Sequence, residues 1–329
     1  MADKLLQIKD LIVDYTTQRG TARAINNVNL EIDKGEIFGL VGESGCGKST
    51  LGKSILKLLP WSASIPNGEI VFKGQKINEL SENEINRDIR GKEISMVIQN
   101  PQNALNPVFT VGRQILDVLY FKSDKKKSRK QLKPKAIDIL KKMGISDPEY
   151  RISEYPHQFS GGMKQRVMLA MAFISNPSLL LADEPTTALD VTVEAQILQL
   201  LKGLVEEFGT SILYITHDLG VVSEITDRIA VMYAGHIVEV ARTRDLFDNP
   251  LHPYTKGLLK CLPGVESRDI LNTIPGMVPD LTNPPEGCKY CPRCDRSEAG
   301  CKVQIPQLKE VREDHYVACF PVVREEGGK

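Results

Sequence analysis

Eight consecutive residues, 42–49, have the types and spacing of a phosphate-binding loop: Gly-Glu-Ser-Gly-Cys-Gly-Lys-Ser, or G-x-x-x-x-G-K-[ST]. The apolar run 37–41 that precedes them has the character of the strand such a loop leaves. Glycines allow consecutive backbone N–H groups to face anionic phosphates, and a helix that starts near Lys48 adds its positive end. Lys48 is expected to reach the β and γ phosphates, and the Ser49 hydroxyl to hold Mg²⁺. The sequence therefore predicts a nucleoside triphosphate site. Its candidate residues are Gly42, Glu43, Ser44, Gly45, Cys46, Gly47, Lys48, Ser49 and Thr50.

A pair of acids follows a second apolar run. Asp183 and Glu184 come directly after residues 179–182, Leu-Leu-Leu-Ala. Hydrolysis of a triphosphate needs one carboxylate to coordinate Mg²⁺ and another to orient or deprotonate the attacking water. Two adjacent acids at a strand end can fill both roles, although an Asp-Glu pair by itself is equally typical of a solvated turn.

Four further segments support the catalytic interpretation of this pair. Gln99 follows a predicted strand at 94–98. Residues 159–163, Phe-Ser-Gly-Gly-Met, open a predicted helix, and Ala-Leu-Asp occupies 188–190. Thr-His-Asp at 216–218 ends another predicted strand.

The elements that must position these residues follow from the apolar pattern. The first 40 residues alternate apolar and polar positions with Gly and Asn-Asn breaks, as antiparallel strands do. Short apolar runs at 179–182, 211–215 and 229–232 alternate with helical stretches, which predicts parallel strands of an α/β core.

Longer helical stretches occupy the region from residue 100 to about 143. A basic block at 125–135 lies within it, but its Ser, Asp and Pro residues favour a solvated helix or loop over a nucleic-acid patch. Lys+Arg and Asp+Glu both number 42, so the formal net charge of zero gives no support to a nucleic-acid partner.

The longest apolar stretch near the middle of the chain, 168–174, is far shorter than the roughly 20 residues that cross a bilayer. The first residues lack the apolar region of a secretory signal, so we expect the protein to stay in the reducing compartment where it is made. Its seven cysteines are then poor candidates for disulfides. We expect Cys46 to be a small filler and Cys261 to pack.

Together, these motifs resemble the ATP-binding cassette family of transport ATPases in order and spacing, from about Leu5 to Tyr254. The resemblance implies an α/β fold of the P-loop NTPase type, with a RecA-like core, an antiparallel β subdomain and an α-helical subdomain. We place the cassette at 1–258, its helical subdomain at about 100–177, and a small C-terminal metal-binding extension at 259–329.

The resemblance also implies roles for single residues. Tyr15 would stack on adenine, and Gln99 would sense the γ phosphate and Mg²⁺ while touching the membrane partner. His217 would clamp the γ phosphate and the attacking water. The implied catalytic residues are Glu184, His217 and Gln99; the implied Mg²⁺ ligands are Ser49, Gln99 and Asp183; Asp190 is assigned to the nucleotide site.

Ser160, Gly161 and Gly162 match the signature of the family. Glycine amides at a helix N-terminus form a second anion site, which the resemblance assigns to the ATP of a partner cassette. Two cassettes would enclose two nucleotides head to tail and separate after hydrolysis. The common signature begins with Leu and ends with Gln, where this chain has Phe159 and Met163.

Three short sequence motifs, at 99–107, 155–158 and 252–255, resemble those of the branch that serves dipeptide, oligopeptide and nickel importers. That branch implies an ATPase bound peripherally at the cytoplasmic face of the membrane. Its implied partners are a second ATPase subunit, identical or different, two transmembrane permeases and an external solute-binding protein. The alternatives are an importer ATPase for nickel or another small solute, a soluble cassette ATPase, and a metal-dependent regulatory protein.

Five cysteines crowd into a C-terminal segment that has too few apolar periods for a core of its own. Cys288, Cys291 and Cys294 form C-x2-C-x2-C, and Cys301 and Cys319 follow. Thiols concentrated in a reducing compartment favour a bound metal, and their spacing alone does not separate zinc from iron and sulfide. The importer branch implies a [4Fe-4S] cluster on Cys288, Cys294, Cys301 and Cys319, with Zn²⁺ as the alternative and Cys291 as a surplus or replacement ligand. We expect the metal to stabilise the segment rather than to sense redox state.

Overall fold

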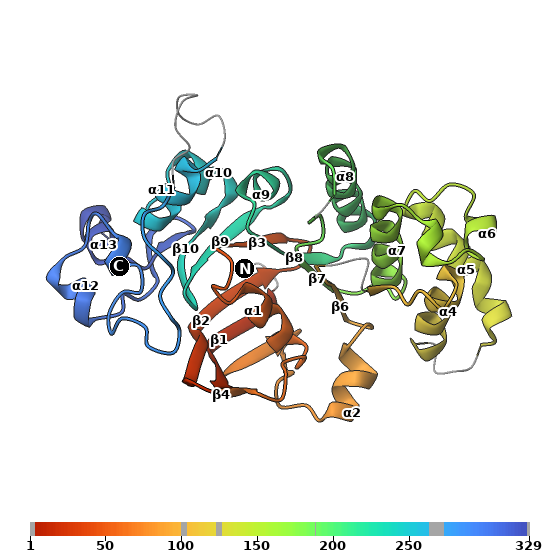
Figure 1. The fold of residues 1–329 in the computed structure, drawn as a ribbon, viewed down its shortest axis with the longest axis horizontal. Coiled ribbons are helices and arrows are strands. Elements are labelled where there is room, and N and C mark those ends of the chain that lie inside the picture. The colour runs from red at the N-terminus through yellow and green to blue at the C-terminus, as the bar shows by residue number, and fades with distance from the viewer. Residues whose placement is uncertain (1–3, 100–103, 123–126, 188, 263–272, 328–329) are drawn as a thin grey trace. The chain divides into compact units, whose positions relative to one another are not determined.

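The chain leaves its first structural unit after residue 79 and returns to it at residue 214 (Figure 1). Residues 1–79 and 214–329 form unit 1, and residues 80–213 form unit 2. This computed structural model describes residues 4–99, 104–122, 127–187, 189–262 and 273–327. Residues 100–103, which belong to the importer-like motif at 99–107, and Ala188 lie outside the described residues.

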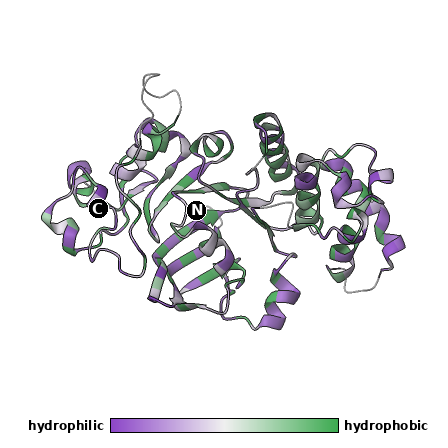
Figure 2. Ribbon diagram, in the orientation of Figure 1, coloured by the Kyte–Doolittle hydropathy of each residue, from purple (hydrophilic) through white to green (hydrophobic). Residues whose placement is uncertain are grey.

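Unit 1 contains a four-stranded antiparallel sheet with the order β2-β1-β4-β5. Its strands are β1 (Lys4–Thr17), β2 (Gly20–Asp33), β4 (Ala63–Phe72) and β5 (Gln75–Lys76). Figure 2 shows apolar and polar bands alternating along β1, β2 and β4, as expected for strands with one buried face. The prediction of antiparallel strands is confirmed.

The Asn26-Asn27 pair does not break the strand, contrary to expectation. β2 continues through it, and the register with β1 shifts between the Leu11–Val28 and Val13–Ile25 pairs. Asn27 has a φ of 54°, a left-handed conformation that asparagine tolerates better than most residues. The pair therefore forms an irregularity within one strand.

A second sheet in unit 1 carries the phosphate loop. β3 (Ile37–Val41) pairs in parallel with β9 (Arg228–Tyr233), as the apolar runs predict. β9 pairs antiparallel with β10 (His236–Arg242), which continues to β12 (His315–Val317) and β11 (Lys309–Arg312). The helices in the described part of this unit are α1 (Lys48–Ile55), α9 (Leu219–Ile225), α10 (Thr243–Asp248), α11 (Pro253–Lys260), η3 (Cys291–Arg293), α12 (Ala299–Val303) and α13 (Phe320–Glu326).

The C-terminal segment shares the core of unit 1. β11 and β12 extend the sheet from β10, and Val317, Cys319 and Val322 pack against Leu251. A segment that is poor in apolar residues thus acquires a buried side by pairing with an existing strand.

Glu239 lies at the centre of this junction and is fully buried. Its carboxylate accepts the backbone N–H groups of Leu251 (2.8 Å) and His252 (2.9 Å) and lies 2.7 Å from His315 Nε2. One acid therefore connects β10, β12 and the start of α11.

Unit 2 contains β6 (Ile94–Val97) and β7 (Leu179–Asp183), which pair in parallel as expected. β6 ends one residue before the predicted boundary at 98. β8 (Ser211–Thr216) starts in unit 2 and ends in unit 1. Its helices within the described residues are α2 (Glu82–Glu84), η1 (Ile85–Ile89), α4 (Val111–Lys122), α5 (Arg129–Lys142), α6 (Pro148–Arg151), η2 (Pro156–Gln158), α7 (Gly161–Phe173) and α8 (Val191–Phe208).

The described part of the basic block forms the solvated helix α5. Ser128 and Gln131 make a reciprocal capping box at its start, and Lys130, Lys133 and Lys135 are exposed. Among the described residues, no helix is both long and apolar enough to span a membrane.

Candidate functional site

The phosphate loop leaves β3 and is pressed against two other strands of unit 1. A Cβ atom on Gly42 would lie 2.1 Å from the carbonyl oxygen of Met232, and one on Gly47 would lie 2.5 Å from that of Ala24. Their φ angles are 155° and 112°, which glycine adopts most readily. These two glycines are therefore required by the path of the loop, apart from any contact with a ligand.

Lys48 is the first residue of α1, as the motif predicts, and is only 6% exposed. Its ammonium group donates to the carbonyl oxygens of Gly42 (2.6 Å) and Glu43 (3.1 Å). No side chain caps the start of α1, so the helix end offers backbone N–H groups. A fixed cation beside such a helix end is suited to anionic oxygens. Cys46 is fully buried, which confirms the small filler that the sequence predicts.

Tyr15 lies beside this loop. Its hydroxyl is 3.3 Å from the hydroxyl of Thr50, which belongs to α1. Because Tyr15 comes from β1 and is half-buried, the structure brings an aromatic ring from the antiparallel sheet to the helix that follows the loop.

Glu43 makes contacts that sequence reasoning missed. Its backbone N–H donates to the hydroxyl of Tyr254 (2.9 Å), and its carboxylate accepts from Arg293 Nη1 (2.7 Å) and Nη2 (3.1 Å). Arg293 is 250 residues away in sequence and lies between Cys291 and Cys294. No local pattern connects an arginine among cysteines with a phosphate loop, so only the fold could show this pair.

The acid pair lies at the end of β7 in unit 2. Asp183 is the last residue of the strand and is 5% exposed. Glu184 follows it with a φ of 47°, an uncommon conformation for a non-glycine residue. Its carboxylate accepts from Gln99 Nε2 (2.5 Å) and from the Thr187 hydroxyl (3.1 Å). The structure thus brings Gln99 and Glu184 together and adds Thr187, which the sequence did not single out.

The signature residues open a helix, as predicted. The Ser160 hydroxyl caps α7 by accepting the Met163 N–H (3.3 Å). A Cβ atom on Gly162 would lie 2.7 Å from Val193 Cγ1, so this glycine allows α7 and α8 to approach closely. Phe159, at the position of the usual leucine, is buried beneath the guanidinium of Arg151, which lies 6.0 Å from the ring centre. Phe159 therefore contributes a buried apolar side chain at this position, as a leucine would.

Asp190 and His217 occupy helix boundaries. The Asp190 carboxylate caps α8 by accepting the Val193 N–H (2.9 Å). His217 is exposed between the end of β8 and Asp218, which caps α9.

The five C-terminal cysteines, with His252 and Arg296, line one cavity. Burial raises the pKa of the Cys288 and Cys319 thiols to about 11. In the described part of the chain, no three His, Cys, Asp or Glu side chains form a group that could hold a metal ion. The structure therefore gathers the cysteines that the sequence singled out without showing a metal site.

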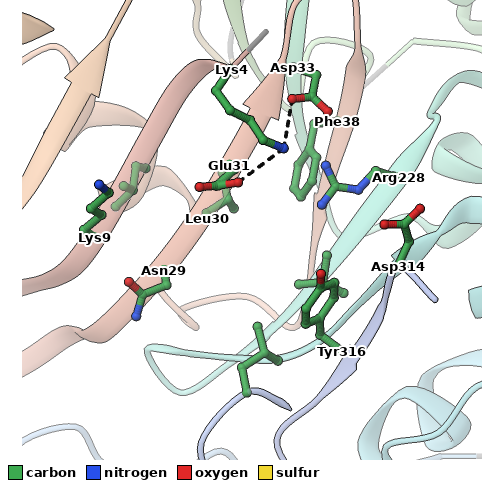
Figure 3. A pocket seen from close by; sticks show the side chains of 13 residues that line it. Lys4, Lys9, Asn29, Leu30, Glu31, Asp33, Phe38, Arg228, Asp314 and Tyr316 are labelled. Carbon is green, nitrogen blue, oxygen red and sulfur yellow. Dashed lines mark ion pairs between the residues drawn. The ribbon is translucent and has the colours of Figure 1, made fainter. Parts of the chain in front are cut away.

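A separate cavity of about 620 Å³ lies among β1, β2, β9 and β12 in unit 1 (Figure 3). Lys4 forms ion pairs there with Glu31 (3.2 Å) and Asp33 (3.0 Å). Arg228 on its wall pairs with Glu36 (3.2 Å). The lining as a whole has three basic side chains (Lys4, Lys9 and Arg228) and three acidic ones (Glu31, Asp33 and Asp314), so the cavity presents no excess of either sign to a ligand.

Comparison with known proteins agrees with this geometry. Residues 25–187 match the family model described as ABC transporter, and residues 238–301 match the one described as oligopeptide/dipeptide transporter, C-terminal region. The chain is 48% identical to the oligopeptide transport ATP-binding protein OppD of Bacillus subtilis, over 95% of this chain and 88% of that protein. It is 46% identical to the dipeptide transport ATP-binding protein DppD of the same organism, over 97% and 95%.

Solved structures include similar cassettes. The ATP-binding cassette MJ0796, in a dimeric post-hydrolysis state bound to ADP and Pi, aligns with a TM-score of 0.65 and 32% identity, covering 73% of this chain and 99% of that one. With a phosphate loop, an acid pair and a signature helix on this fold, the chain belongs to the ABC transporter family and is an ATP-hydrolysing cassette.

Proposed function

We propose that this chain is the ATPase subunit of a peptide importer. The main support for the proposal is that one chain contains both an ABC cassette and a C-terminal region that matches the oligopeptide/dipeptide transporter model. The relatives named for oligopeptide and dipeptide transport align over nearly the whole chain. Peptide is thus favoured over nickel or another small solute as the cargo.

The test of cargo is uptake. Membrane vesicles with the complete transporter should accumulate labelled dipeptide or oligopeptide when supplied with ATP, and vesicles with a Lys48→Ala subunit should not. Accumulation of nickel without peptide would favour the alternative cargo.

In the proposed reaction, the backbone of residues 42–47 and Lys48 bind the phosphates, and Tyr15 stacks on adenine. Ser49, Gln99 and Asp183 would hold Mg²⁺, which neutralises the phosphate oxygens when bound. Glu184 orients and deprotonates the attacking water, and His217 holds the γ phosphate. The contacts of Glu184 with Gln99 and Thr187 support this role because they fix the direction of the carboxylate.

Ser160, Gly161 and Gly162 serve the nucleotide of a second cassette in this proposal, and Asp190 contributes beside them. Binding of ATP by both halves favours the closed pair, so hydrolysis can drive a two-state change in the attached permeases. The second cassette is a different subunit, and the assembly lies at the cytoplasmic face of the membrane with two permeases and an external binding protein. Co-purification from native membranes should recover this second ATPase together with both permeases.

Exposed apolar side chains in unit 2 offer a surface for a permease. Val108 (72% exposed) and Phe109 (47%) precede α4, and Tyr155 (41%) comes from the segment that follows α6. The two segments are joined by a bond from the Val111 N–H to the Glu154 carbonyl (2.9 Å). Replacing Phe109 with Asp should release the ATPase from permease-containing membranes while leaving nucleotide binding intact, whereas Phe121→Asp, also exposed, serves as the control.

The cysteine cavity is proposed to hold a [4Fe-4S] cluster, with Zn²⁺ as the alternative. Four thiolates suffice for such a cluster, and Cys288, Cys294, Cys301 and Cys319 are the proposed ligands, with Cys291 as a replacement. The observation that supports this proposal is that all five cysteines line one cavity. Because burial raises the pKa of the Cys288 and Cys319 thiols to about 11, binding of a metal at neutral pH would release their protons.

Anaerobic purification followed by iron, sulfide and zinc analysis separates the two metals. Single Cys→Ser variants then identify the ligands, because only replacement of a true ligand should lower the metal content. Loss of metal in Cys291→Ser but not in Cys319→Ser would exchange the assignment of these two.

A further inference from the structure

The phosphate loop is held by a residue from the cysteine-bearing segment. Arg293 makes a two-pronged contact with the Glu43 carboxylate, at 2.7 and 3.1 Å. Contacts of this geometry are among the strongest hydrogen-bonded ion pairs in proteins. Only 5% of the Arg293 side chain and 27% of the Glu43 side chain are exposed, so water screens this pair less than it screens a pair on the open surface.

Arg293 is itself fixed on several sides. Its Nε donates to the Pro275 carbonyl (2.8 Å), and its Nη2 also donates to that of Ile274 (3.2 Å). Its guanidinium lies 5.7 Å from the ring centre of Tyr233 and 6.0 Å from that of Tyr290. These contacts hold the Arg293 guanidinium in place without Glu43, so Arg293 can fix the position of the Glu43 carboxylate.

The position of Glu43 matters to the nucleotide for two reasons. Its carbonyl oxygen accepts a hydrogen bond from Lys48 Nζ, so the residue that Arg293 holds also contacts the phosphate-binding lysine. Its carboxylate is a negative charge within a loop built for anions, and an unpaired carboxylate there would repel phosphates. Arg293 both orients the loop and neutralises this charge.

We propose that Arg293 is a positioning residue for nucleotide binding, which makes ATP affinity depend on the cysteine-bearing segment that carries it. Arg293 lies in η3 between Cys291 and Cys294. Any change that displaces η3 would act on the loop through the Arg293–Glu43 pair. The proposal requires only that the loop binds nucleotide; it does not depend on the cargo or on the identity of a metal.

The test is a double-mutant cycle on the binding of a fluorescent ATP analogue carrying a ribose label, with Mg²⁺ present. Arg293→Gln should weaken binding about tenfold, or about 1.4 kcal/mol. Glu43→Gln should weaken it by about threefold or less, and adding Arg293→Gln to Glu43→Gln should cause no further loss, because the unpaired charge is then gone.

The matched control is Arg312→Gln in the same segment. Arg312 also makes a two-pronged contact with a glutamate, Glu326 (2.9 and 2.9 Å), but it lies in β11 and its contact does not involve the phosphate loop. The Arg312→Gln variant should bind the analogue as the unmodified chain does. Metal content and the thermal midpoint, measured on every variant, identify any loss that comes from unfolding.

Unchanged binding in Arg293→Gln, or a double variant as weak as Arg293→Gln alone, would overturn the proposal in favour of a purely structural bridge. Should Arg293→Gln fail to fold, Arg293→Lys keeps the charge without the two-pronged geometry and should weaken binding about threefold; unchanged binding there would likewise overturn it. Failure of the unmodified chain to bind the analogue would instead contradict the ATP site itself.

Discussion

Glu184 illustrates how one residue can be prepared for chemistry. It stands directly after a buried strand in a left-handed conformation, and two neighbouring side chains donate to its carboxylate. Backbone strain of this kind costs about 1–3 kcal/mol and persists where the surroundings enforce it. In this conformation the carboxylate accepts a hydrogen bond from Gln99, a partner 85 residues away.

Glu184→Gln should retain ATP binding and lose at least about a hundredfold in turnover, because an amide cannot accept the proton of the attacking water. The variant should also accumulate as an ATP-bound pair of cassettes. Phosphate release and size-exclusion chromatography with ATP measure the two effects, and Glu206→Gln, at an exposed residue of α8, is the control. Hydrolysis at the unmodified rate would show that Glu184 is not the base.

Gly42→Ala tests the path of the phosphate loop. The new Cβ would lie 2.1 Å from a backbone oxygen, so the loop must shift, and we expect lower thermal stability and loss of nucleotide binding. Gly203→Ala is the matched control, because Gly203 is exposed within α8 with no atom within 4 Å of an added Cβ. That change should stabilise unit 2 by about 0.5–1 kcal/mol. Nucleotide binding that survives Gly42→Ala would contradict the geometry of the loop.

At the scale of elements, β11 and β12 are stabilised because β10 offers its free backbone groups for pairing with β12. β12 pairs with β10, and Glu239 joins the strands to the start of α11 through three buried hydrogen bonds. This arrangement lets the cysteine-bearing segment pack in the same unit as the phosphate loop.

Glu239→Ala should lower the free energy of unfolding by about 3–5 kcal/mol, because two backbone N–H groups and a buried imidazole lose their acceptor. Thermal unfolding followed by circular dichroism measures the loss. Glu313→Ala, at a side chain that is 91% exposed, should change it by less than about 0.5 kcal/mol. Similar midpoints for the two variants would show that Glu239 does not hold the segment.

At the scale of the whole molecule, the candidate residues are divided between the two units. The phosphate loop, Tyr15 and His217 belong to unit 1, whereas Gln99, the acid pair and the signature residues belong to unit 2. In the proposed mechanism a nucleotide also needs the signature of a second cassette, so activity must depend on encounters between chains.

The specific hydrolysis rate per chain should therefore rise with protein concentration, in near proportion while most chains are single. A dilution series with saturating ATP measures this, on the chain alone and mixed with its co-purifying ATPase. The same series with Ser160→Arg in every cassette should stay flat, because the anion site for the partner's nucleotide is blocked. A rate per chain that is constant over a hundredfold dilution would contradict the proposed pairing.

Much of the molecule could be predicted from local pattern. The phosphate loop, the start of α1 at Lys48, the parallel strands on either side of the acids and the helix opened by Ser160 all depend on contiguous residues. Their signals are short-range, because apolar period, glycine placement and helix caps express the preferences of neighbouring residues. The family, and with it ATP hydrolysis, followed from these motifs.

Tertiary structure alone decided what depends on contacts between distant residues. The Asn26-Asn27 pair continues a strand because β1 pairs with the residues before and after it, Ile25 and Val28. Gln99 reaches Glu184, 85 residues away, only because β6 and β7 lie side by side. The contact of Arg293 with the phosphate loop spans 250 residues and has no sequence signal, since either side chain alone is an ordinary charged residue. The sequence determined the chemistry of each part; packing decided that the cysteine-bearing segment and the nucleotide loop share one ion pair.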